Sequence, residues 1–127
     1  GVAGLVGGSS DMRDLENAVA AGDERAIMTL DVYNYRIKKY IGAYAAAMGG
    51  CDILVWTGGV GENQWATRRV VCENMEYMGM KIDVEKNEGM RGEEMVISTP
   101  DSKVTIIVVP TDEEYMIAAD TMDILGK

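Results

Sequence analysis

The sequence predicts an α/β domain in which helices flank a largely parallel sheet. Helix-length segments alternate with short runs of apolar, often β-branched residues, in the order helix, helix, strand, helix, strand, strand, helix. An apolar share of 47% and a charged share of 26% are typical of a folded globular chain. No repeat or linker divides the 127 residues, which is the size of one ordinary domain. We therefore expect residues 1–127 to form one domain or part of one.

The first half of the chain is predicted to be mostly helical. Residues 1–10 are rich in glycine and serine and predict a loop, which a helix follows from about Asp11 to Ala21. Asp23 is a good N-cap for a long second helix, and Gly49-Gly50 ends it. Apolar residues recur along that helix at intervals of three and four and predict a buried stripe: Leu30, Tyr33, Ile37, Ile41, Tyr44 and Met48.

The second half is predicted to supply the sheet. The apolar run Ile53–Trp56 predicts a strand that is buried on both faces. A tight glycine turn at 58–61 and a helix from about Asn63 to Met78, ended by Gly79, come next. The remaining segments are two strands, a polar loop and a last helix: Met95–Ser98, Val104–Val109, residues 86–92, and about Asp112 to Leu125. Met80–Asp83 could add a further short strand.

Composition excludes several classes of site. The chain has no histidine, so it can hold neither a Ser-His-Asp triad nor a histidine-ligated metal, and two cysteines are too few for a Cys₄ zinc site. A net charge of −9 argues against binding to nucleic acid, because Arg36, Lys38 and Lys39 form the only tight basic cluster. No uncharged stretch is long enough to cross a bilayer, and no signal peptide opens the chain. We expect a cytoplasmic protein without a membrane or nucleic-acid partner.

The segment Val55–Asn63 is the first candidate site. A strand that ends in glycines before a helix N-terminus can bind phosphate, because glycine lets the backbone approach the ligand and the first N–H groups of the helix are available as donors. No Gly-Lys-Ser/Thr follows, so this is not a Walker loop, and its glycine spacing does not fit the Rossmann fingerprint. The residues alone leave two interpretations open: a phosphate or nucleotide site, and a tight connection between strand and helix.

Two shorter segments also permit two interpretations each. Thr111 and Glu114 form a capping box, while the carboxylates of 112–114 could also serve a Mg²⁺-nucleotide at the end of a strand. Near the N-terminus, Asp11 can cap a helix, and together with Arg13 it could also hold the ribose and adenine of a nucleotide. For residues 111–114 the capping role alone explains most of the pattern, and the signal at Asp11 and Arg13 is weak when taken by itself.

Taken together, four segments resemble the C-terminal part of the acetate kinase (acetokinase) family, which belongs to the sugar kinase, Hsp70 and actin superfamily. They are Gly4–Arg13, Tyr35–Tyr44, Thr57–Asn63 and Pro110–Glu114, and their order and spacing agree with the family over nearly the whole chain. The resemblance implies a partial ribonuclease H-like, actin-like ATPase fold. It also implies Mg²⁺-dependent transfer of phosphate from ATP to acetate, giving acetyl phosphate and ADP.

The resemblance assigns site residues one by one. Asp11, Met12 and Arg13 would lie against the adenosine. The glycine segment would bind the nucleotide through Gly59, Val60, Gly61, Glu62 and Asn63. Glu113 would be the Mg²⁺ ligand, which leaves Glu114 to the capping box. The chain departs from the family pattern at Trp56 and at Asp112, where a second negative charge would stand beside the metal ligand.

The resemblance also implies that catalysis needs residues that this chain lacks. The family uses a histidine and arginines from upstream segments, so we assign no catalytic residue here and expect the chain alone to be inactive. A sheet edge left uncovered by upstream strands would favour self-association, and we expect a homodimer. The alternatives are a propionate or butyrate kinase, whose acyl pocket would also lie upstream, and a stand-alone nucleotide-binding module without catalysis.

Overall fold

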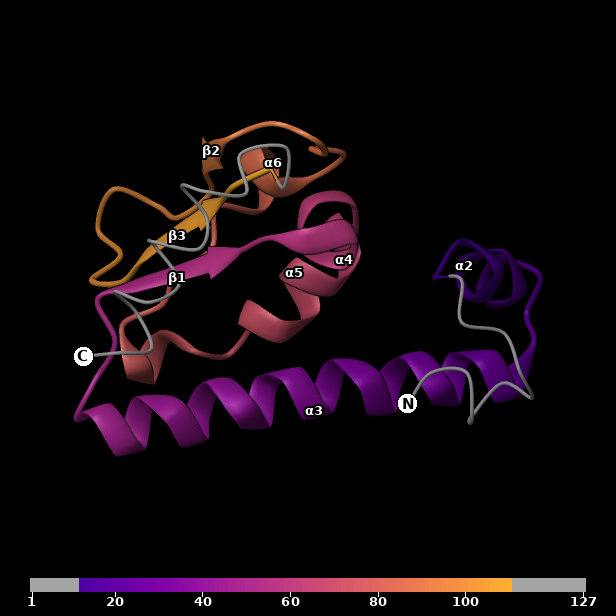
Figure 1. Ribbon diagram of the computed structural model, residues 1–127, viewed down its shortest axis with the longest axis horizontal. Coiled ribbons are helices and arrows are strands. Elements are labelled where there is room, and N and C mark those ends of the chain that lie inside the picture. Colours follow the sequence, from indigo (N-terminus) through magenta and orange to yellow (C-terminus); the bar gives the residue numbers. More distant parts are fainter. Residues whose placement is uncertain (1–11, 111–127) are drawn as a thin grey trace. The chain divides into compact units, whose positions relative to one another are not determined.

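The computed structural model describes residues 12–110, which fall into two compact units, the first ending at Tyr40 and the second beginning at Ile41. The first unit contains α2 (Met12–Ala20) and most of α3 (Glu24–Met48), which continues into the second unit (Figure 1). Gly22 joins the two helices with a φ of +84°, a left-handed conformation that suits glycine. Both predicted helices are thus confirmed to within a residue or two at each described end.

Asp23 is the predicted N-cap of α3. Its Oδ1 accepts hydrogen bonds from the backbone N–H groups of Arg25 (2.9 Å) and Ala26 (3.2 Å). These are N–H groups of the first turn, which no carbonyl of the helix itself can satisfy. The sequence therefore predicted the start of α3 for the right physical reason.

The predicted stripe on α3 is only half-buried. Tyr44 is 54% exposed, and the other five members are partly buried. The fully buried residues of α3 are small or polar, namely Ala26, Thr29, Asn34 and Ala45. These four residues alternate with members of the stripe along the same side of α3. The buried face of the helix was therefore predicted correctly, but the stripe residues are less buried than predicted. Large side chains need a second layer of structure to cover them, and residues 12–110 do not supply a complete one.

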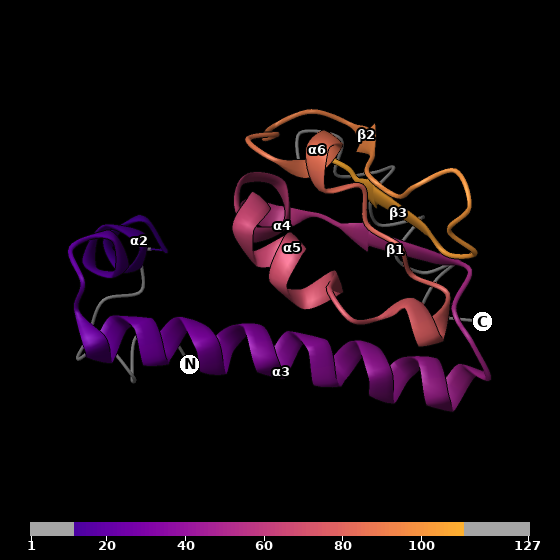
Figure 2. The same ribbon diagram turned by 180° about the vertical axis from the view of Figure 1, so that it is seen from behind.

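The second unit is built around a small mixed sheet in the order β1-β3-β2 (Figures 1 and 2). The strands β1 (Ile53–Trp56) and β3 (Thr105–Val108) run parallel, with Ile53 opposite Thr105 and Trp56 opposite Val108. The strand β2 (Met95–Val96) runs antiparallel to β3. The predicted α/β class is therefore confirmed. A largely parallel sheet is not, because one of the two strand pairs described is antiparallel.

Burial along the strands follows their positions in the sheet. In β3, Ile106 and Val108 are inaccessible to water, as expected of a central strand. In β1 only Trp56 is buried, and Ile53 is 42% exposed, so the prediction that this strand is buried on both faces was wrong. The difference arises because β1 is an edge strand of the described sheet and lacks a neighbour on its outer side there.

The helix predicted from Asn63 to Met78 is replaced by three shorter elements. These are α4 (Gly58–Asn63), α5 (Trp65–Cys72) and the 3₁₀ helix η1 (Glu76–Met78). Gly79, at a φ of +86°, ends η1 as predicted. A further short helix, α6 (Val84–Asn87), occupies part of the region predicted as a polar loop. The strand predicted at Met80–Asp83 is reduced to one bridge between Ile82 and Ser98.

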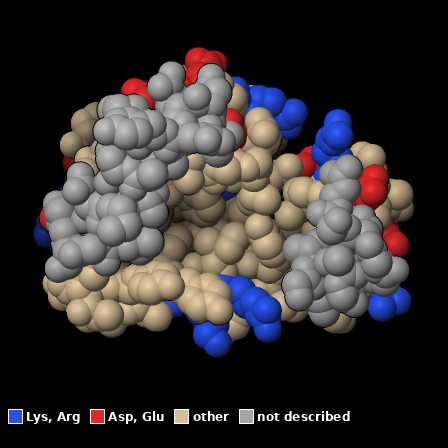
Figure 3. Space-filling view, in the orientation of Figure 1, with Lys and Arg blue, Asp and Glu red and all other residues tan. Residues whose placement is uncertain are grey.

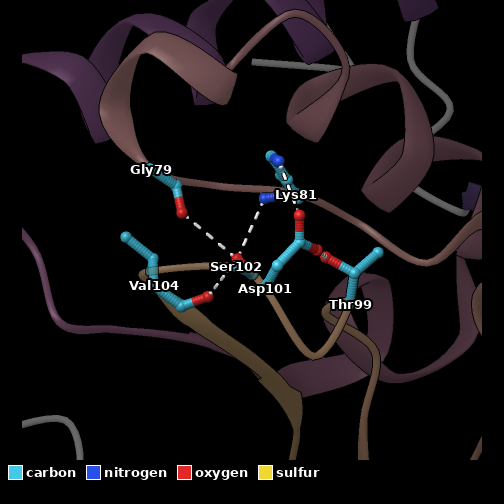
Figure 4. A network of polar contacts seen from close by, with 6 residues as sticks. All are labelled: Gly79, Lys81, Thr99, Asp101, Ser102 and Val104. Atoms are coloured by element: carbon cyan, nitrogen blue, oxygen red, sulfur yellow. Dashed lines mark hydrogen bonds and ion pairs between the residues drawn. The ribbon is translucent and has the colours of Figure 1, made fainter.

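A surface cluster joins the segment after η1 to the turn before β3 (Figure 4). Lys81 Nζ lies 2.7 Å from Asp101 Oδ2, and the Thr99 hydroxyl donates to Asp101 Oδ1 at 2.7 Å. Ser102 Oγ accepts from the Lys81 backbone N–H at 3.0 Å and donates to the carbonyl oxygen of Val104 (2.6 Å) or of Gly79 (3.1 Å). We call Lys81, Thr99, Asp101 and Ser102 the turn cluster.

The basic cluster predicted on the second helix lies on α3. Arg36 and Lys39 are exposed, and Lys39 Nζ lies 5.3 Å from the centre of the Tyr35 ring, a cation–π contact. Figure 3 shows basic side chains along the edge of the molecule where Figure 1 draws this helix. Among residues 12–110, no helix is both long and apolar enough to span a membrane.

Candidate functional site

The glycine-rich segment begins where β1 ends. Trp56, the last residue of β1, is 7% exposed, and Thr57 continues in extended conformation with φ −149° and ψ 173°. Gly58 then turns the chain with a φ of +78°, which a residue with a side chain rarely adopts. The glycines predicted to form a turn before a helix are themselves the first residues of α4, so that part of the prediction was wrong.

Gly61 explains why α4 packs so tightly against the end of β1. A Cβ atom at this position would lie 2.9 Å from the carbonyl carbon of Trp56, closer than real Cβ contacts come. At Gly59, by contrast, an added Cβ would meet nothing within 4 Å. Packing therefore requires glycine at position 61, and packing within the described residues does not require it at position 59.

The segment that connects β1 to α4 also carries polar atoms without a partner. In the described part of the chain, Thr57 Oγ1 and Trp56 Nε1 are buried and make no hydrogen bond. The first N–H groups of α4 likewise have no acceptor inside the helix. Buried polar groups are normally satisfied, so the Thr57 hydroxyl, one residue before the glycine segment, is a candidate donor to a polar ligand.

The other end of α4 is held by Arg68, which lies on α5 and is inaccessible to water. Its Nη1 donates to the carbonyl oxygens of Gly61 (2.7 Å) and Glu62 (3.0 Å). Its Nη2 donates to the carbonyl of Met90, and its Nε donates to Asn87 Oδ1 at 2.8 Å. We call this group, Arg68 with its acceptors on Gly61, Glu62, Asn87 and Met90, the Arg68 cluster.

The charge of Arg68 is buried without a carboxylate. Every acceptor of its hydrogen bonds within residues 12–110 is an uncharged amide oxygen. Burial lowers the pKa of Arg68 to about 10, which still leaves the guanidinium protonated at neutral pH. A fixed positive charge thus lies at the carboxyl end of α4, where it complements the helix dipole.

Sequence reasoning missed Arg68 and Asn87. A signal for Arg68 was present, because in the helix predicted from Asn63 to Met78 it would share one face with the apolar residues Val71, Cys72 and Met75. All three are buried in the structure, although α5 itself ends at Cys72. An arginine in an apolar stripe must find acceptors inside the protein. No comparable pattern surrounds Asn87, whose Nδ2 also donates to the carbonyl of Trp65 at 2.9 Å.

The structure brings together five of the nine predicted site residues. Gly59, Val60, Gly61, Glu62 and Asn63 all belong to α4. Met12 and Arg13 lie on α2, in the first unit, while Asp11 and Glu113 lie outside the described residues. Among residues 12–110, no three or more histidine, cysteine, aspartate or glutamate residues gather as a metal site would require. The described residues alone do not form a donor set for Mg²⁺.

Comparison with known proteins agrees with the resemblance that the motifs carry. The family model of the acetokinase family matches residues 1–119. The chain is 90% identical over its whole length to an acetate kinase of Parabacteroides distasonis, of which it covers 32%. The chain therefore spans about a third of the length of the curated relatives it matches.

Solved structures give the same result. The crystal structure of Porphyromonas gingivalis acetate kinase superposes with a TM-score of 0.87 at 66% identity, covering 98% of this chain and 31% of that one. A propionate kinase from Francisella tularensis superposes with a TM-score of 0.75 at 33% identity, covering 93% of this chain and 29% of that one. With a family model that matches nearly the whole sequence, the chain belongs to the acetokinase family.

Proposed function

We propose that this chain is the C-terminal, nucleotide-binding portion of an acetate kinase, an enzyme that transfers phosphate from ATP to acetate and gives acetyl phosphate and ADP. The observation that carries the proposal is the 90% identity to an acetate kinase over the entire chain. The ribonuclease H-like, actin-like ATPase fold, a cytoplasmic location and a homodimeric enzyme are parts of the same proposal.

Within that function, α4 binds the phosphate groups of the nucleotide. The support is local: Gly59 leaves room for close approach of a ligand, and the unpartnered Thr57 hydroxyl lies one residue before the helix. Glu62 and Asn63 end the helix and are partly buried. Asp11, Met12 and Arg13 would contact the adenosine. Glu113 would hold Mg²⁺, which in such enzymes neutralises the transferring phosphate.

The chain alone should not catalyse the reaction. Phosphoryl transfer depends on positioning and on cations around the transferring group, and this chain contributes no histidine. Acetate is the proposed acceptor because curated relatives at 56–90% identity are named acetate kinase. Identity near 30% does not discriminate, since it is 31% to an acetate kinase of Entamoeba histolytica and 33% to the propionate kinase. A propionate kinase remains the second candidate on the strength of that structural neighbour.

A titration with Mg²⁺-ADP, followed by backbone amide shifts, tests nucleotide binding by the chain. We expect saturable shifts at Gly59–Asn63 and at Asp11–Arg13, and smaller effects from Mg²⁺ with inorganic phosphate. A Gly59→Ala variant is the control: it keeps the fold, since its Cβ meets nothing, but it narrows the approach to the backbone. Unchanged spectra at saturating Mg²⁺-ADP would contradict a surviving nucleotide site.

Coupled assays test the activity. In the longer enzyme that carries this segment, we expect kcat/KM to be higher with acetate than with propionate. In the isolated chain we expect no acetyl phosphate. Turnover by the isolated chain at a normal enzyme rate would overturn the proposal that catalysis needs residues which this chain does not contain. A preference of the longer enzyme for propionate would favour the second candidate.

A further inference from the structure

The α4 helix cannot hold its own conformation. It has six residues, three of them glycine, and Gln64 breaks the chain direction before α5. Isolated helices of this length are unstable in water, and glycine lowers helix stability further. Its geometry must therefore be fixed by contacts from outside the helix.

Those contacts come from two directions. At the β1 side, the backbone of Gly61 lies directly against Trp56. At the carboxyl end, the guanidinium of Arg68 holds the carbonyl oxygens of Gly61 and Glu62, and the Gly92 N–H donates to the Glu62 oxygen at 3.2 Å. The first N–H groups of α4 face away from this anchored end, since all N–H groups of a helix point toward its N-terminus.

Arg68 also ties α4 to two other segments. Asn87 ends α6 and Met90 lies in the loop beyond it, and both accept from the same guanidinium that holds α4. Asn87 in turn accepts from Arg68 while donating to Trp65, the first residue of α5. One planar side chain with donors on all three nitrogens thus sets the position of α4 relative to α5, α6 and the loop after α6.

We infer that Arg68 is a positioning residue for the nucleotide: without touching it, Arg68 fixes the carboxyl end of α4 and so the direction of the N–H groups that meet the phosphates. This inference rests on the proposed nucleotide site at α4. An apolar residue could fill the same volume, but it could not hold four oxygen acceptors on three segments. The buried charge also raises the electrostatic potential at α4, which favours an anionic ligand.

The test uses the longer acetate kinase that carries this segment, with Arg68→Lys as the main variant. Lysine keeps the positive charge but has one ammonium group in place of the planar guanidinium with its three nitrogens. It can therefore reach only some of the four acceptors. We expect the KM for MgATP to rise about tenfold, the effect of losing one charged hydrogen bond, while the KM for acetate changes less than twofold. The melting temperature is measured in parallel.

Arg69→Lys is the matched control. Arg69 is the neighbouring residue on the same helix, but its side chain is 42% exposed, and its ion pair with Glu73 is a surface pair at 3.5 Å. Neither KM should change. If Arg68→Lys does not fold, Asn87→Ala replaces it. That variant removes one acceptor and leaves the other three, so the KM for MgATP should rise two- to threefold without a change for acetate.

Two results would overturn the inference. One is a folded Arg68→Lys enzyme whose KM for MgATP is unchanged. The other is a loss in which kcat and both KM values worsen together with a lower melting temperature, which indicates a structural role only. Failure of the proposed function would look different, because the unsubstituted enzyme would then lack ATP-dependent turnover.

Discussion

Two polar clusters hold the second unit together, and they differ in where their charges lie. In the Arg68 cluster, Arg68 bonds to Asn87 and Met90, which lie 19 and 22 positions further along the chain. In the turn cluster, Lys81 bonds to Asp101, 20 positions further along. In the first, a guanidinium inaccessible to water has only uncharged acceptors within residues 12–110. In the second, the ion pair is between side chains that are 44% and 68% exposed.

The comparison shows why the presence of an ion pair does not indicate how much a cluster contributes to the stability of the fold. A surface pair such as Lys81–Asp101 exchanges hydration for a screened attraction and contributes little. The buried guanidinium makes no ion pair in the described residues, yet its removal leaves several oxygens without a donor in a place that water does not reach. The two clusters should therefore respond very differently to substitution.

The largest effect is expected for Arg68→Met. Methionine fills the volume but satisfies none of the four acceptors, so the free energy of unfolding should fall by at least about 3 kcal/mol. Urea denaturation measures the loss. Arg69→Met, the exposed neighbour, should cost no more than about 0.5 kcal/mol. Equal losses for the two variants would remove the distinction between buried and exposed cations on α5.

A smaller effect is expected for Gly61→Ala. The added Cβ would lie 2.9 Å from a backbone atom of Trp56, so α4 must shift, at a cost of about 1–3 kcal/mol. Gly59→Ala is the control from the same helix. Its Cβ meets nothing within 4 Å, and replacing glycine in a helix stabilises by up to about 1 kcal/mol. Thermal melts of both variants check the sign as well as the size.

These sites also show how far the sequence could predict the structure. The Asp23 cap, the parallel strands at Ile53 and Thr105 and the role of Gly79 followed from local patterns, because caps, apolar runs and left-handed glycines act within a few residues. The break at Gln64 did not follow, since α4 is held there by Arg68 together with Asn87 and Met90, and the last two lie outside the predicted helix. The family motifs identified α4 as a site, but they did not indicate the hydrogen bonds of Arg68 that hold α4 in place.

An intermediate effect belongs to Ser102, a half-buried member of the turn cluster. Its hydroxyl accepts from the Lys81 N–H and donates to Val104 or Gly79, joining three segments around one oxygen. Ser102→Ala should lower the free energy of unfolding by about 1–2 kcal/mol, because the Lys81 N–H loses its acceptor in a part-buried place. Ser102→Thr, which keeps the hydroxyl, should recover part of that loss in the same denaturation experiment.

The smallest effect, and the only one that depends on acid, belongs to Asp101. Hydrogen bonds from Lys81 and Thr99 lower the pKa of Asp101 from 3.8 to about 2. A carboxyl group with a lowered pKa in the folded state stabilises fully above its unfolded value of 3.8, and that contribution disappears as the pH falls through about 2. Asp101→Asn should therefore lower the melting temperature slightly at pH 7, and the two proteins should converge near pH 2.

Lys81→Gln separates the two causes of that shift. It removes the ion pair but leaves the Thr99 hydroxyl on Asp101, so the pKa of Asp101 should rise part of the way toward 3.8. A carboxyl-detected NMR titration follows this directly in the folded chain. A midpoint that stays near 2 without Lys81 would assign the shift to Thr99. The turn cluster would then resemble the Arg68 cluster, with one charged group held by uncharged partners, but with the opposite charge and at an exposed place.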